Sequence, residues 1–334
     1  MNAQLQFQLL DDQWSLFPNI SHYYFKLGAY RVCLSFADTT LPEKIVRAFD
    51  HLKIDAIDTP DLTICLWDVT ETACKLPNLN WALICSYGYA GYLERGVYFH
   101  YFEEIMALSV LSNAKNKAFY IVRDSQQLPW WVSGSPLQVI LHLWLSARDL
   151  KLTHTAAIGN ERAAVLLTGK GGSGKSTTVL SCMRAGLSYL GEDYCILECD
   201  NYPTVYSIYQ SAKWESNTRK LFPDYESHIK NPLEAITEKA LVYYQDFFSA
   251  QIKLAMPISG IIALSVGDAE APFLKKQERH LALKNLMMST VKQLPLAHHN
   301  TIPILMNIVS KTACYELILG KDVDKNVALI RSLL

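Results

Sequence analysis

The sequence has no apolar run long enough to cross a membrane and no excess of charge of either sign. A membrane-spanning helix needs about 20 consecutive apolar residues, whereas the most apolar stretch, residues 256–266, has only the length of a strand. The 334 residues include 31 basic and 32 acidic side chains, which gives a formal net charge of −1. We therefore expect neither a nucleic acid nor a membrane as partner.

The sequence also lacks paired cysteines and a signal peptide. Its first residues contain no basic segment followed by an apolar one, which predicts a cytoplasmic protein. The eight cysteines are scattered, and none forms a CxxC pair. This spacing favours buried, reduced thiols over disulfides or a zinc site.

Residues 1–130 are predicted to form a strand-rich α+β domain. Helical periodicity with a proline near its start predicts a helix over residues 42–52, and we expect a second helix over residues 103–113. This part has no glycine-rich loop and no cluster of metal ligands, and we expect it to recognise a substrate or a partner. β-branched and aromatic runs predict strands at residues 30–36, 62–69, 81–87, 96–102 and 118–123.

A segment rich in proline and glycine, residues 128–136, predicts a domain boundary near residue 130. An amphipathic helix is expected next, over residues 136–150. Strands and helices then alternate, so residues 131–334 are predicted to form an α/β domain. Its strands are expected at residues 163–168, 187–190, 194–198, 258–266 and 314–319, and its helices at 176–185, 282–291 and after 322.

A glycine-rich loop follows the predicted strand at residues 163–168. Such a loop between a strand and a helix binds nucleotide phosphates, because glycines let backbone N–H groups approach phosphate oxygens and the helix N-terminus adds partial positive charge. The alternative is a structural turn without a ligand. The loop matches the pattern GxxxxGK[ST] and consists of Gly169, Lys170, Gly171, Gly172, Ser173, Gly174, Lys175 and Ser176.

This loop predicts a bound nucleoside triphosphate, and we expect ATP with Mg²⁺. Lys175 is expected at the β- and γ-phosphates, and the Ser176 hydroxyl is expected to coordinate Mg²⁺. Lys170 and Thr177 are further candidates for phosphate contact.

An acidic pair, Glu192 and Asp193, is placed to return to this loop. The helix over residues 176–185 moves the chain away by about 15 Å, and the next strand brings it back by about 16 Å. If that strand is parallel to residues 163–168, both carboxylates lie at the edge of the sheet where α/β sites form. Phosphoryl transfer uses a carboxylate at the metal and a base for the attacking hydroxyl, and we assign both roles to Asp193, assisted by Glu192. The alternative is an acidic surface turn.

His154 lies just before the strand that leads into the loop. Two roles remain open for it. It either positions the γ-phosphate or packs as a structural residue at a domain seam.

These residues together resemble a known family. The segment from His154 to Ala157, followed by AAVLLTGKGGSGKSTTVLSCMRAGLSYLGEDYCIL, resembles the catalytic core of HPr serine kinase/phosphorylase. It is closer still to HPr-kinase-related proteins encoded in bacterial peptide-biosynthesis and sugar-metabolism gene neighbourhoods. The resemblance covers residues 130–334 and implies a P-loop kinase fold shared with phosphoenolpyruvate carboxykinases.

The resemblance also implies roles for single residues. His154 matches the family histidine. Glu192 and Asp193 match an acidic pair that is usually Asp-Asp, in which one acid acts as base toward a serine and both lie near the metal. Glu192 is one methylene longer, which makes Asp193 the better candidate for the base. Lys213 matches a lysine in the closer relatives, which implies either contact with phosphate or acceptor, or a solvated side chain.

The family carries a second loop, used in phosphorolysis and in contact with the protein substrate, which has no counterpart in this sequence. Phosphorylase activity and HPr as substrate are therefore not expected. Members of the family assemble into oligomers, so the resemblance implies a homo-oligomer.

Three functions follow from these observations. The first is an ATP-dependent kinase that phosphorylates a hydroxyl, above all that of a serine, on a peptide, a protein or a small molecule. Its catalytic residues are expected to be Asp193, Glu192, Lys175 and His154. The second is a nucleotide-binding regulatory or scaffold subunit with little catalysis. The third is an ATPase without an acceptor.

Overall fold

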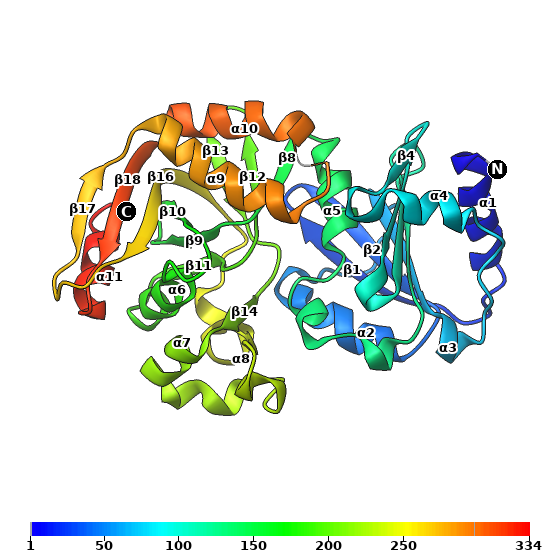
Figure 1. The fold of residues 1–334 in the computed structure, drawn as a ribbon, viewed down its shortest axis with the longest axis horizontal. Helices are drawn as coiled ribbons and strands as arrows, with labels where there is room; N and C mark the ends of the chain where they lie inside the picture. The colour runs from blue at the N-terminus through cyan, green and yellow to red at the C-terminus, as the bar shows by residue number, and fades with distance from the viewer. Residues whose placement is uncertain (1, 297) are drawn as a thin grey trace. The chain divides into compact units, whose positions relative to one another are not determined.

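The computed structural model describes residues 2–296 and 298–334, and it has a mixed α/β fold with several sheets (Figure 1). The chain divides into two compact units, Met1–Ala147 and Arg148–Leu334. The predicted boundary near residue 130 differs from this division by one helix, α5 (Gln138–Ser146). That helix belongs to the first unit because Trp144 is fully buried there, with its ring 5.2 Å from that of Tyr30.

The first unit is a mixed sheet in the order β1-β2-β3-β7-β6-β5-β4. Its core contains apolar side chains of helix α1 (Ala3–Trp14), such as Phe7, packed against Trp67 and Phe119. The strands are Ser21–Leu27, Tyr30–Phe36, Leu62–Asp68, Tyr92–Glu94, Val97–Phe102, Ala107–Ser112 and Lys117–Val122, in chain order. The other helices of this unit are Thr40–Ile45, Val69–Thr72 and Trp81–Ser86, with 3-10 turns that include Val46–Leu52.

Two predictions for the first unit are wrong. The strand expected at residues 81–87 is helix α4 (Trp81–Ser86), because the Asn80 side chain accepts a hydrogen bond from the Leu83 N–H and caps a helical turn. The helix expected at residues 103–113 is a short 3-10 turn followed by strand β6 (Ala107–Ser112). Strand β6 pairs with β5 and β7 on its two edges, and all of its residues are buried.

The second unit is built on a larger sheet with the strand order β11-β9-β10-β16-β13-β12-β8, in which β18 also pairs with β16 and with β17. A separate hairpin consists of β14 and β15. In chain order, β8 to β18 are Leu150–Thr153, Ala156–Gly159, Ala164–Thr168, Ser188–Gly191, Cys195–Cys199, Pro203–Tyr206, Ser211–Trp214, Ala240–Tyr243, Ala255–Val266, Phe273–Lys276 and Ala313–Leu319.

Helices cover both faces of this sheet (Figure 1). Alternate residues of β10 point to opposite faces: Val165 packs with residues of α6 and α11, and Leu166 packs with residues of α9 and α10. The helices from α6 to α11 are Lys175–Arg184, Ser216–Leu221, Gln245–Phe248, Arg279–Gln293, His298–Lys311 and Val323–Arg331. The strands and helices predicted for residues 163–334 are confirmed, with ends that shift by a few residues.

In the second unit, the C-terminal ends of several strands lie at the same edge of the sheet. Strands β10, β16 and β18 are mutually parallel. Strand β11 is antiparallel to β9, which is antiparallel to β10, so β11 runs in the same direction as β10. The strand before Glu192 and Asp193 therefore runs in the direction that the sequence analysis assumed, which places both residues at the same edge of the sheet as the glycine loop.

All eight cysteines are free thiols. Burial was predicted for all of them, but Cys85 is exposed and Cys74 and Cys199 are only partly buried. Among the described residues, no helix combines the length and the apolar character that a membrane crossing requires.

Candidate functional site

The glycine loop, residues 169–174, connects the end of β10 to the start of α6. Gly169, Gly172 and Gly174 have φ values of 151°, 76° and 90°, which L side chains rarely adopt. A Cβ on Gly174 would lie 2.6 Å from Leu319 Cδ1, whereas a Cβ on Gly171 would meet nothing within 4 Å. The loop is therefore packed against the sheet at its end and open at its middle, where its backbone can approach a ligand.

Positive charge and N–H donors converge above this loop. Helix α6 begins at Lys175 with its free N–H groups directed toward the loop. The Lys175 ammonium donates a hydrogen bond of 2.7 Å to the Gly169 carbonyl oxygen. Burial lowers the pKa of Lys175, and the carboxylates of Glu192 and Asp193 oppose that shift. The loop is thus suited to bind an anion.

A buried hydroxyl in the loop lacks a partner. The Ser173 side chain is 5% exposed, and its Oγ has no hydrogen-bond partner among the described residues. Buried polar groups are nearly always satisfied in folded proteins. An unsatisfied hydroxyl on the wall of a cavity indicates a place for a polar ligand.

The two acidic residues lie beside this loop but face different partners. Ser176 Oγ donates a hydrogen bond to Glu192 Oε1, and the Glu192 side chain is almost fully buried. Asp193 instead accepts from Lys213 Nζ at 3.2 Å and contacts His154 Nε2 at 2.9 Å. The carboxylate that meets the serine of the loop is therefore Glu192, whereas the sequence had favoured Asp193 for that position.

The environments of the two carboxylates separate their pKa values. Burial raises the pKa of Glu192 to about 7, aided by the Asp193 charge and opposed by the Ser176 hydrogen bond. Burial acts in the same direction on Asp193, but the Lys213 ammonium and the His154 hydrogen bond outweigh it and hold the pKa of Asp193 well below its usual range. Asp193 is therefore ionised at neutral pH.

His154 lies between β8 and β9 and is fixed by its surroundings. Its backbone N–H donates to Thr290 Oγ1 at 3.2 Å, and its carbonyl accepts from Ser289 Oγ at 3.0 Å. The imidazole ring contacts the Tyr194 ring, with centroids 5.3 Å apart. Because Asp193 is ionised, Nε2 is the protonated nitrogen that donates to it. His154 thus orients Asp193.

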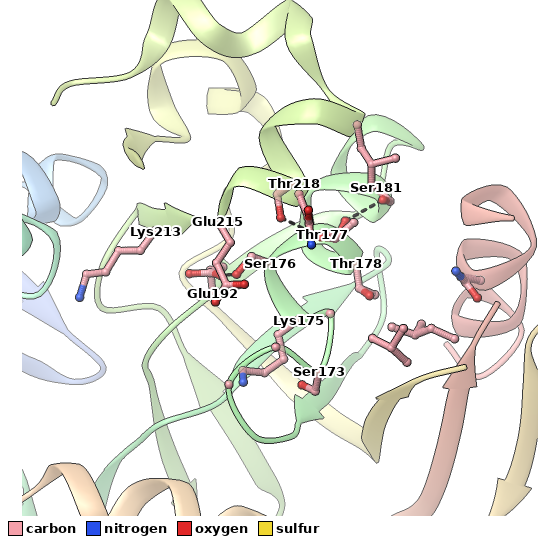
Figure 2. A pocket seen from close by; sticks show the side chains of 18 of the residues that line it. Ser173, Lys175, Ser176, Thr177, Thr178, Ser181, Glu192, Lys213, Glu215 and Thr218 are labelled. Carbon is pink, nitrogen blue, oxygen red and sulfur yellow. Dashed lines mark hydrogen bonds between the residues drawn. The ribbon is translucent and has the colours of Figure 1, made fainter. Parts of the chain in front are cut away.

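One cavity of about 560 Å³ joins these groups. Figure 2 shows Ser176 and Glu192 pointing toward one another in it, with Lys175 nearby. Thr177 also lines the cavity, and its hydroxyl lies 2.7 Å from that of Thr218. The predicted site residues from Gly171 to Thr177 line it together with His154, Glu192 and Asp193, whereas Gly169 and Lys170 do not.

The cavity also contains residues that the sequence did not single out. Glu215 and Lys239 form an ion pair of 3.3 Å at one side. Glu215 directly follows β14 and Lys239 directly precedes β15, and the register of the two strands brings Trp214 opposite Ala240. No motif spacing could predict this pair, because the two residues are distant in the sequence and a helix, α7, and two 3-10 turns lie between them.

A second wall of the cavity comes from the C-terminal ends of β16 and β18 and from helix α11. It is lined by Val266, Leu319, Val323 and Val327, and Val266 is 65% exposed. The parallel order of β10, β16 and β18 could have indicated this wall, because such strands end at the same edge of a sheet.

The donor set fits Mg²⁺. Magnesium prefers oxygen ligands, keeps several waters and is bound by one or two protein groups together with substrate phosphates. The Ser176 hydroxyl and the Glu192 carboxylate meet that requirement. Among the described residues no group of three or more His, Cys, Asp or Glu side chains is arranged to hold a metal.

Comparisons with known proteins give little beyond this geometry. No family model matches the chain, and no curated protein matches it. Among solved structures, the Hpr(Ser) kinase/phosphatase from Coxiella burnetii aligns with a TM-score of 0.30 and 13% sequence identity, over 55% of this chain and 93% of that chain.

Proposed function

We propose that the protein is an ATP-dependent kinase that transfers the γ-phosphoryl group of ATP to a hydroxyl. The observation that carries this proposal is the gathering of three groups on one cavity: the glycine loop, the Ser176–Glu192 pair and the Asp193–His154 pair. A nucleotide-binding module needs only the loop. A metal ligand and a group for the attacking hydroxyl are the further parts that phosphoryl transfer uses.

The loop and helix α6 bind the triphosphate. A Cβ on Gly171 or Gly172 would meet nothing within 4 Å, so phosphate oxygens can approach the backbone there without a side chain in the way. Lys175 leaves the Gly169 carbonyl and pairs with the β- and γ-phosphates. The Ser173 hydroxyl gains the partner that it lacks.

Ser176 and Glu192 would hold a magnesium ion. Bound there, Mg²⁺ would supply positive charge that offsets the negative charge of the triphosphate during transfer. Glu192 binds it as the carboxylate, and the positive charges of the metal and of Lys175 favour that ionised form over the protonated one.

Asp193 acts on the acceptor. The acceptor hydroxyl oxygen forms the new bond to the γ-phosphorus, the bond to the bridging oxygen breaks, ADP leaves, and the proton passes to Asp193. In a loose transition state the acceptor hydroxyl needs only a weak base. The low pKa of Asp193 is therefore compatible with its role as proton acceptor. Lys213 and His154 hold it ionised and oriented. The resemblance of residues 130–334 to HPr kinases supports a serine as the acceptor.

The test is transfer of label from γ-labelled ATP to proteins, peptides and small molecules of a cell extract. The wild type is expected to label an acceptor. Lys175→Ala is expected to lose both ATP binding and transfer, because the phosphates lose their cation. Asp193→Asn is expected to bind ATP with little change and to transfer about 10²–10⁴-fold more slowly, the usual contribution of a positioned acid or base.

Other outcomes distinguish the alternatives. Phosphoryl transfer by Asp193→Asn at the wild-type rate would contradict the role assigned to Asp193. Release of labelled phosphate to water without a labelled acceptor identifies an ATPase, and ATP binding without either product identifies a regulatory subunit.

A further inference from the structure

The cavity extends past the phosphate loop onto an aliphatic surface. The side chains of Val266, Leu319, Val323 and Val327, which we call the aliphatic shelf, line the cavity together with the loop. Val266 ends β16 and is 65% exposed. The shelf therefore gives an apolar wall to a cavity whose phosphate end is lined by glycines, hydroxyls and charged groups.

The shelf is continuous with the loop. A Cβ built on Gly174 would lie 2.6 Å from Leu319 Cδ1 and 3.7 Å from Val266 Cγ2, so both side chains lie directly beside the start of α6. In the proposed mechanism Ser176 and Glu192 hold the metal beside the γ-phosphate. A triphosphate that runs from there across the N-terminus of α6 would bring the group attached to its α-phosphate to the shelf.

Polar groups around the shelf are already paired. The Asn326 side-chain amide donates to the Gly320 carbonyl and accepts from the Gly320 N–H, both at 2.9 Å. The N–H of Gly267 donates to the Leu319 carbonyl oxygen, and the N–H of Lys321 donates to the Ala269 carbonyl oxygen. Leu319 and Val327 are nearly buried and belong to the core, so Val266 and the partly buried Val323 are the aliphatic surface that the shelf offers to a ligand.

We propose that the aliphatic shelf binds the nucleoside of the triphosphate by apolar contact with the base, with little hydrogen bonding to its edge. Strong selection between bases comes from hydrogen bonds whose loss leaves buried polar groups unpaired. A shelf of this kind therefore binds ATP and GTP with similar affinity and gains affinity from the presence of a base. This inference rests on the proposed binding of a nucleotide at the loop but not on phosphoryl transfer.

Calorimetric titration of the full chain with the Mg²⁺ complexes of ATP, GTP and inorganic tripolyphosphate tests this. The wild type is expected to bind ATP and GTP with dissociation constants within tenfold of each other, and both at least tenfold tighter than tripolyphosphate. Val266→Asn, which adds no charge, is expected to weaken ATP and GTP binding about tenfold, the equivalent of part of the transfer free energy of one valine. Tripolyphosphate binding is expected to stay unchanged.

Leu281→Asn is the matched control, since Leu281 is an exposed aliphatic side chain of α9 outside the cavity. It is expected to change none of the three affinities. A preference between ATP and GTP of more than tenfold overturns the proposal, and so does an equal effect of Val266→Asn on ATP and tripolyphosphate. Unchanged affinity of Val266→Asn for all three ligands overturns it as well. Failure of both ATP and tripolyphosphate to bind contradicts the phosphate site itself.

Discussion

At the scale of single residues, the site separates two carboxylates that are neighbours in the sequence. Glu192 meets the loop serine, and Asp193 meets a histidine and a lysine from other elements. The extra methylene of Glu192, which sets it apart from the Asp-Asp pair of the family that the sequence resembles, belongs to the side chain that reaches Ser176. In the proposed mechanism the longer side chain therefore holds the metal, and the shorter one faces the acceptor.

This division predicts distinct effects on the magnesium requirement. Glu192→Gln is expected to raise the Mg²⁺ concentration for half-maximal ATP binding about 10–100-fold, because even partners of metal ligands contribute that much to affinity. Titration of Mg²⁺ at fixed ATP measures it. Glu316→Gln, which removes an acid paired with Lys275 outside the cavity, is the control and is expected to leave the requirement unchanged.

The same Mg²⁺ titration distinguishes the roles of Glu192 and Asp193. A larger rise with Asp193→Asn than with Glu192→Gln would show that Asp193 holds the metal, as the sequence alone suggested.

The residues of the loop were predictable from the sequence, but their partners were not. The pattern GxxxxGK[ST] is local, and the helix and strand lengths were enough to place the acidic pair beside it. Which acid faces Ser176 depends on side-chain direction at the end of β11, and the ion pair of Lys213 with Asp193 depends on the β14–β15 hairpin. Neither of these two contacts can be predicted from the spacing of residues in the sequence.

At the scale of elements, the loop owes its shape to glycines that differ in what surrounds them. Gly174 has a φ of 90° and lies against Leu319, whereas Gly171 has open space where a side chain would begin. A side chain at Gly174 therefore meets both backbone strain and a steric conflict.

Gly174→Ala is expected to lower the free energy of unfolding by about 1–3 kcal/mol, the usual cost of a residue held in an unfavourable backbone region. Gly171→Ala is the matched control and is expected to change it by no more than about 0.5 kcal/mol, as for other surface positions. Urea unfolding in the absence of nucleotide measures both. Equal effects at the two positions would contradict the difference in backbone strain and packing between these glycines.

Predictions of elements succeeded where a segment is strongly apolar. The strand at residues 163–168 is a short apolar run, and all residues of β10 are buried, as in a strand covered on both faces. Strand β18 buries only Cys314, Leu317 and Leu319. The predictions at residues 81–87 and 103–113 were wrong because a cap on Asn80 and two-sided sheet pairing of β6 outweigh local periodicity. Both effects depend on neighbours distant in the sequence or on one side-chain bond.

At the scale of the whole molecule, each unit has a core of its own. The core around Trp67 and Phe119 belongs to the first unit, and the cores on the two faces of the β10 sheet belong to the second. Every residue proposed to bind nucleotide lies in the second unit.

Binding is therefore expected to stabilise the two units unequally. Saturation with ATP and Mg²⁺ at 100 times the dissociation constant stabilises the folded state of the binding unit by about 2.7 kcal/mol. Amide hydrogen exchange in β10 and α6 is expected to slow by up to about 100-fold, with little change in β3 and β7. Equal slowing in both units would contradict this expectation, and Lys175→Ala is expected to abolish the effect.

The contact of Leu319 with Gly174 has a consequence for synthesis. The loop leaves the ribosome well before β18, the strand that ends at Leu319 and packs against it. Contacts between segments so distant in the chain form late in folding, because closing the long intervening segment costs conformational entropy before the contact can stabilise the structure. A nascent chain that already exposes its glycine loop but not yet β18 therefore lacks one side of the proposed binding site, and we expect nucleotide binding only after β18 is translated.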